Sequence, residues 1–92
     1  ANPTAALTVA DSALARDSTN VAILWRASRA ALALGFLASH QSSENADYRR
    51  AEDYARRATR AAPRDATGHA WLAAALGRRA LFADLIPTAR LG

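Results

Sequence analysis

The sequence predicts an all-α protein: an antiparallel helical-hairpin array of four main helices, forming a single domain over residues 1–92. Three observations support this prediction. Apolar residues recur at three- and four-residue spacing through most of the chain, and no segment alternates as a strand does. Cap-forming residues and proline stand where helices would begin or end. Alanine, the best helix former, supplies much of an apolar fraction of 51%.

Cap-forming residues in the first half of the chain predict two helices. Asn2 is a good N-cap residue, and Pro3 follows it at the first helical position, where a missing N–H costs nothing. Thr19 or Asn20 is placed to cap a second helix. The expected helices therefore cover about residues 3–16 and 21–38.

The second half begins with the polar, aperiodic segment 39–45, which we predict to be a loop. Helical spacing resumes at Ala46, and Pro63 ends the third helix because proline cannot continue it. Asp65 is a natural N-cap for the fourth helix. These signals predict helices at about 46–62 and 66–83 and a tail at 84–92.

The apolar faces indicate how the helices pack. The first helix has one narrow stripe, made by Leu7, Ala10 and Leu14. The second helix is apolar on two sides, so we expect it to lie between neighbours. One side consists of Leu24, Ala27, Ala31 and Leu34, and the other of Trp25, Leu32 and Phe36.

Composition excludes several classes of function. With no cysteine, the chain has no disulfide, thiolate metal site or cysteine nucleophile. Neither histidine has metal-ligand spacing to a second ligand, and no catalytic motif or phosphate-binding loop is present, so we expect no metal, no cofactor and no enzymatic activity. The longest strongly apolar stretch, 30–38, is about half of what a transmembrane segment needs.

All 12 basic residues are arginine, and against 8 acids they give a net charge of +4. This excess raises the alternative of an anionic partner such as nucleic acid. Glu52 and Arg56 stand four residues apart, as do Asp53 and Arg57, and Arg49 and Asp53, so we expect much of the charge to pair along the helix. Nucleic-acid binding through the remaining arginines, Arg50, Arg60 and Arg64, is the less favoured interpretation.

Residues 48–63 resemble the second helix of a tetratricopeptide repeat, with small residues at Ala51 and Ala58 and a terminal proline at Pro63. Such small residues let two helices approach closely. Matching the two helix exits places Val21 opposite Ala66, a period of about 45 residues against about 34 in the common repeat. We expect the added length in the second helix and its loop.

A closer resemblance covers nearly the whole chain. Residues 24–30 (LWRASRA), 54–58 (YARRA) and 69–73 (HAWLA) resemble the helical repeat domain of the regulator of microtubule dynamics family and its bacterial relatives. The resemblance implies association with other proteins and no defined chemistry. The arginine and alanine usage fits a bacterial relative better than a microtubule binder.

In a repeat of this kind the first helix of each hairpin lines a concave groove. The resemblance therefore implies a partner-binding set of Trp25, Arg26, Arg29, Leu32, Trp71 and Arg78, with Thr67, Ala70 and Ala74 beside it. Each tryptophan is either a groove residue or a core residue. Arg29 and Arg78 suit the recognition of carboxylates, because a guanidinium fork binds them bidentately. We therefore expect a protein or peptide partner, acidic or aromatic in character.

Two function classes remain open from the sequence. The favoured one is a non-catalytic protein-protein interaction scaffold that binds its partner in the groove. The other is a structural self-association module that forms a homo-oligomer, because a short helical array can leave an apolar face uncovered. In that case the assembly surface would consist of Trp71, Leu81, Phe82 and Leu85.

Overall fold

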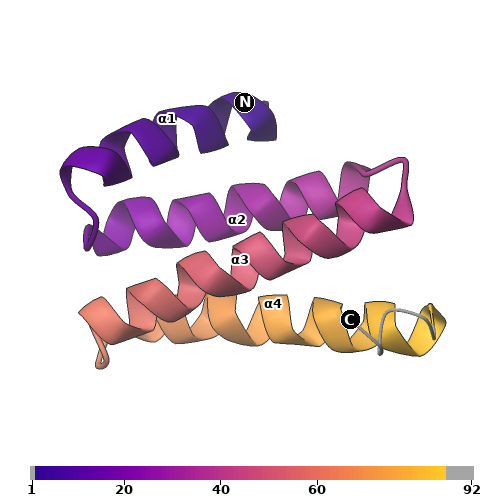
Figure 1. Cartoon of the computed structure of the whole chain (residues 1–92). Helices are drawn as coiled ribbons and strands as arrows, with labels where there is room; N and C mark the ends of the chain where they lie inside the picture. The colour runs from indigo at the N-terminus through magenta and orange to yellow at the C-terminus, as the bar shows by residue number, and fades with distance from the viewer. Residues whose placement is uncertain (1, 87–92) are drawn as a thin grey trace.

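The computed structural model describes residues 2–86 and confirms an all-helical fold, with no strand in that part of the chain. The four helices are α1 (Pro3–Arg16), α2 (Val21–Leu37), α3 (Gln41–Ala61) and α4 (Ala66–Leu85). Successive helices run in opposite directions, so α2 and α4 run the same way (Figure 1). α1 packs on α2, while α3 lies across both α2 and α4.

Three of the four helices begin at side-chain caps. Asn2 accepts a hydrogen bond from the Thr4 N–H at 2.8 Å, and Asn20 accepts one from the Ile23 N–H at 3.2 Å. Asp65 does the same for Thr67 at 2.9 Å. Each bond satisfies a backbone donor that the first turn of a helix leaves without a partner.

The start of α3 differs from the prediction. The helix begins at Gln41, so the loop expected over 39–45 was wrong, and the connection is reduced to residues 38–40. His40 forms no side-chain cap bond that would mark the boundary. The segment contains no glycine or proline to break a helix, and its first three residues are exposed, so polar side chains cost nothing there. Glu44 then accepts the Tyr48 hydroxyl hydrogen bond at 2.8 Å, one turn away.

Two other boundaries shift slightly. α2 ends at Leu37, and α4 continues to Leu85 beyond the expected end at 83. The predicted helix starts at Val21 and Ala66 are observed, so the spacing of about 45 residues between them is present. The residues in excess of the common repeat length lie partly in α3 and not in a long loop. The rest of the predicted tail, 87–92, lies outside the described residues.

The core is built largely from small residues. Leu7, Ala10 and Leu14 of α1 are buried against α2, as the stripe predicted. The middle of α2 and the inner face of α3 consist mainly of fully buried alanines, which let the two helix backbones approach closely. These residues are Ala27, Ala31, Ala51, Ala55 and Ala58.

α2 and α3 approach each other closely at Gly35. A Cβ atom built at this position would overlap the aromatic ring of Tyr48, which is itself only 3% exposed. The ring also contacts Phe82 of α4 edge to face, with centroids 6.3 Å apart. Phe82 is therefore a core residue, 6% exposed, and its expected place on an exposed assembly surface was wrong. The crossing of α3 over α4 turns it inward.

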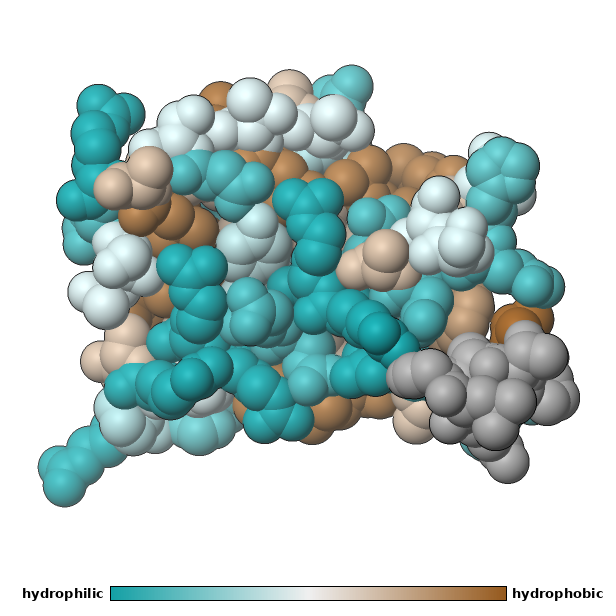
Figure 2. Space-filling view, viewed as in Figure 1, coloured by the Kyte–Doolittle hydropathy of each residue, from teal (hydrophilic) through white to brown (hydrophobic). Residues whose placement is uncertain are grey.

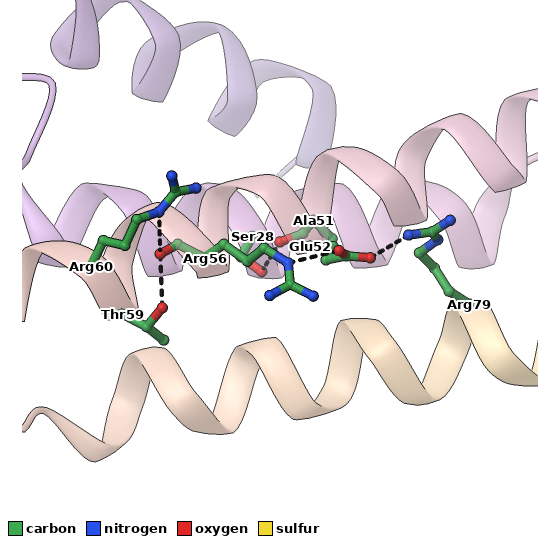
Figure 3. Close-up of polar contacts among 7 residues, drawn as sticks. All are labelled: Ser28, Ala51, Glu52, Arg56, Thr59, Arg60 and Arg79. Carbon is green, nitrogen blue, oxygen red and sulfur yellow. Dashed lines mark hydrogen bonds and ion pairs between the residues drawn. The ribbon is translucent and has the colours of Figure 1, made fainter. Parts of the chain in front are cut away.

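Polar bonds reinforce this packing. Ser28 is fully buried in α2, and its hydroxyl donates to the Ala51 carbonyl oxygen of α3 at 2.8 Å. Glu52 accepts from Arg56 at 2.8 Å on its own helix, as predicted, and also pairs with Arg79 of α4 (Figure 3). Figure 2 shows the hydrophilic side chains gathered across this face, over α3. Glu52 thus ties the polar face of α3 to α4.

Candidate protein-binding groove

The candidate site is a hollow of about 570 Å³ between the parallel helices α2 and α4. No α3 residue lines it. The lining is small or apolar apart from two arginines. α2 contributes Arg29, Leu32, Ala33 and Phe36. α4 contributes Trp71, Ala73, Ala74, Gly77, Arg78 and Leu81. We call this hollow the α2–α4 groove.

Helical spacing explains why these side chains meet. On α2, positions 29, 32, 33 and 36 follow one face at three- and four-residue steps, and on α4 positions 74, 77, 78 and 81 do the same. The groove therefore includes four of the six predicted partner-binding residues, Arg29, Leu32, Trp71 and Arg78, together with Ala74. Their role in binding stays a prediction.

The two tryptophans form one stacked pair. The rings of Trp25 on α2 and Trp71 on α4 are nearly parallel, at 6°, with centroids 6.4 Å apart. Both residues are half-buried. The stacked pair joins α2 to α4, and of the two only Trp71 lines the groove.

Aromatic rings hold the arginines of the groove. The guanidinium carbon of Arg29 lies 5.3 Å from the Trp25 ring centroid, and that of Arg26 lies 5.2 Å from it. Arg26 does not line the groove. At the other end, the guanidinium carbon of Arg78 lies 4.0 Å from the Phe36 ring centroid. A cation over a ring face is attracted by the ring quadrupole, which restricts where the guanidinium lies.

Gly77 is one of the groove residues that sequence reasoning missed. A Cβ atom built there would meet no neighbouring atom within 4 Å, so the α4 backbone is open to the groove at this point. Glycine inside a helix lowers helix stability by about 1 kcal/mol relative to alanine. A glycine in the middle of α4 was therefore a signal of a packing or functional role at this position. Phe36 was assigned to an apolar side of α2 but not to the binding set, although it is 56% exposed.

A comparison with known protein families covers the same four helices. A family model described as Regulator of microtubule dynamics protein 1-3 matches residues 2–85, which include all four helices. The chain belongs to this family. No curated protein and no solved structure matches the chain. Membership confirms the resemblance drawn from residues 24–30, 54–58 and 69–73, while the tetratricopeptide assignment and a bacterial source stay predictions.

This member of the regulator of microtubule dynamics family has a second, polar hollow of about 620 Å³ between α1 and α3. Asp11 of α1 is held there by two α3 residues. The Tyr54 hydroxyl donates to it, and Arg50 pairs with it at 3.5 Å. Arg50 was left without a predicted partner on its own helix, and α1 brings a carboxylate to it. Its availability to an anionic surface stays a prediction.

Arg57, which was predicted to pair with Asp53, contacts the turn that follows α1. Arg57 donates to the Ser18 carbonyl oxygen at 3.2 Å, and its guanidinium carbon lies 5.9 Å from the Tyr54 ring centroid. The charged residues of the polar hollow therefore have a structural role, because they hold α1 to α3. The described residues contain no group of histidine, cysteine and carboxylate side chains that could hold a metal ion.

None of the helices over residues 2–86 is both long enough and apolar enough to cross a bilayer.

Proposed function

We propose that this chain is a non-catalytic protein-interaction module that binds a peptide segment of a partner protein in the α2–α4 groove. The observation that carries the proposal is the groove itself, a hollow of about 570 Å³ with an apolar floor and an arginine toward each end. This volume lies within the usual range for ligand sites, about 300 to 1,000 Å³. Solenoid repeats use such concave faces to bind extended partners.

Family membership supports association with proteins in general. The description of the family names microtubule dynamics, and we carry over to this chain only the binding of a protein partner. The groove provides what a peptide needs: apolar surface to bury, and few charged groups to fix its orientation.

The test is selection of binders from a random peptide library, with a variant that fills the groove as the comparison. Gly77→Leu places a side chain into the open space at the floor, and Ala46→Leu adds the same side chain at an exposed position of α3. We expect selected peptides to bind the wild type and Ala46→Leu alike and to lose at least tenfold in affinity for Gly77→Leu. Peptides that bind all three proteins equally would place the binding surface elsewhere.

Self-association is the alternative function, and exposed apolar residues favour it. Leu85 is 70% exposed and Leu81 46% exposed, and they lie at the end of α4. Phe36 and Leu37, 56% and 71% exposed, lie at the end of α2. Both ends point the same way (Figure 1). Light scattering coupled to size exclusion separates the two functions, because an assembly module shows a mass that rises with concentration.

A further inference from the structure

We infer that the partner segment is an extended acidic peptide in which a bulky apolar side chain lies between two carboxylates about five residues apart. The inference rests on the proposed function and adds the chemistry of the ligand. It follows from three features of the α2–α4 groove: the open space at Gly77, the two arginines, and the distance between the aromatic rings that hold them.

The open space at Gly77 fits an apolar side chain of the ligand. No atom lies within 4 Å of a Cβ built there, and the surrounding floor includes Leu32, Ala33 and Ala74. A leucine or phenylalanine of the peptide would fill the space and remove both surfaces from water, which is the main favourable term in such contacts. A polar side chain would find no hydrogen-bonding side chain on this apolar part of the floor.

The two arginines supply the charge complementarity. Arg29 and Arg78 are the charged residues of the described lining, and no carboxylate lines the groove with them. Each guanidinium carbon lies over an aromatic ring, and a cation in that position is attracted by the ring quadrupole. A guanidinium carries several N–H groups with which it can bind a carboxylate. Glu44 borders an adjacent hollow with Arg78, where it accepts the Tyr48 hydroxyl hydrogen bond at 2.8 Å, and it does not line the groove.

The positions of the rings set the spacing in the ligand. Trp25, which holds Arg29, and Phe36, which faces Arg78, stand about three helical turns apart on α2, or roughly 16 Å at 1.5 Å per residue. An extended chain rises about 3.3 Å per residue, so roughly five residues separate two carboxylates that reach both arginines. The side chain over Gly77 then comes from a residue between them.

An acidic peptide fits this groove better than a second copy of the chain does. The chain carries a net charge of +4, so two copies repel each other at long range, whereas an acidic segment is attracted to the groove.

The experiment uses a labelled, end-capped peptide containing Glu-Ala-Ala-Leu-Ala-Glu and measures its binding by fluorescence anisotropy at low ionic strength. One control peptide has glutamine in place of both glutamates, and a second has serine in place of leucine. We expect each control peptide to bind about tenfold more weakly, and added salt to weaken only the acidic peptides.

Protein variants then locate the effect. Arg29→Gln and Arg78→Gln should each reduce the preference for the acidic over the neutral peptide about threefold or more, while Arg60→Gln, an exposed arginine of α3 outside the groove, leaves it unchanged. Gly77→Leu should remove the preference for leucine over serine. A preference for acid that survives in both groove variants would overturn the inference, since net charge alone would explain it.

The outcomes also separate this inference from the proposed function. Equal binding of acidic and neutral peptides, blocked in both cases by Gly77→Leu, overturns the acidic ligand and leaves the groove as a peptide site. The same conclusion follows if none of the three designed peptides binds while library-selected peptides bind the wild type and not Gly77→Leu. Failure of every peptide, selected or designed, overturns both.

Discussion

At the scale of single residues, the fold depends on buried positions that a different side chain would not fit. Gly35 is the clearest one, because the Tyr48 ring occupies the space that any side chain would need. The buried Ser28 is another, since its hydroxyl bonds the Ala51 carbonyl oxygen across the α2–α3 interface. Neither position touches the α2–α4 groove, so both can be tested without disturbing it.

Gly35→Ala is expected to lower the free energy of unfolding by about 1 to 3 kcal/mol, the usual cost of overpacking a core. The added methyl would force the buried Tyr48 ring or the α2 backbone to move. Chemical denaturation measures this change. Gly77→Ala is the matched control, because the methyl there enters open space and helix propensity should raise stability by about 1 kcal/mol. Equal effects of the two substitutions would contradict the packing described at Gly35.

Tyr48 also gives the fold a dependence on alkaline pH. Burial, and then the hydrogen bond to Glu44, raise the pKa of Tyr48 from 10.0 to about 12. In the unfolded chain the phenol loses its proton at lower pH than in the folded chain. Its contribution to stability is therefore fully present below pH 10 and is lost as the pH rises toward 12.

Denaturation curves recorded across that range should show a falling free energy of unfolding, with a shallower fall in Tyr48→Phe. Part of the fall should remain in the variant, because burial and the bond to Asp11 also raise the pKa of Tyr54. A profile unchanged by the substitution would show that Tyr48 ionises normally in the folded protein.

At the scale of helices, caps and spacing made much of the fold predictable. Asn2 and Asp65 cap their helices as the sequence indicated, and of the two candidates Thr19 and Asn20 it is Asn20 that caps α2. The start of α3 could not be predicted because no side-chain bond marks it and a polar, exposed first turn has the composition of a loop. The inward turn of Phe82 depends on the crossing of α3 and α4, which sequence spacing does not define.

The same distinction applies to the groove. Helical spacing and the family resemblance selected Arg29, Leu32, Trp71 and Arg78, which the structure brings to one hollow. The open space at Gly77 was missed, because an empty volume depends on which atoms lie opposite, and these come from another helix. Cross-helix partners such as Asp11 for Arg50 were missed for the same reason.

The attachment of α4 to α3 should depend on Glu52. Burial raises the pKa of Glu52, but hydrogen bonds from Arg56 and Arg79 outweigh this effect and hold the pKa below its ordinary value of 4.5. Glu52→Gln is expected to lower the free energy of unfolding at neutral pH by about 1 kcal/mol, given that both arginines are partly exposed.

The effect of Glu52→Gln should also depend on pH. The carboxylate stabilises the fold above pH 4.5 and loses this effect as the pH falls through its lowered pKa, where it takes up a proton. Thermal unfolding of wild type and variant should therefore differ at neutral pH and converge in strong acid. A difference that is constant with pH would mean that the charge of Glu52 has no part in it.

At the scale of the whole molecule, we expect a monomer whose groove is free. The net charge of +4 opposes close association, and Phe82, once expected on an assembly surface, is buried in the core. Light scattering should give one constant mass over a wide range of concentrations. A mass that doubles, and returns to the monomer value in Leu85→Lys, would show instead that the exposed end of α4 is an interface.

The parallel course of α2 and α4 gives the groove a direction (Figure 1). The peptide dipoles of both helices point the same way, so the end of the groove near Trp25 and Trp71 is the more positive and the end near Phe36 and Leu81 the more negative. A bound segment would therefore meet two unlike ends. A peptide and its reversed sequence, identical in composition, should bind with different affinities, and the molecule would read not only which residues a partner carries but in which order they come.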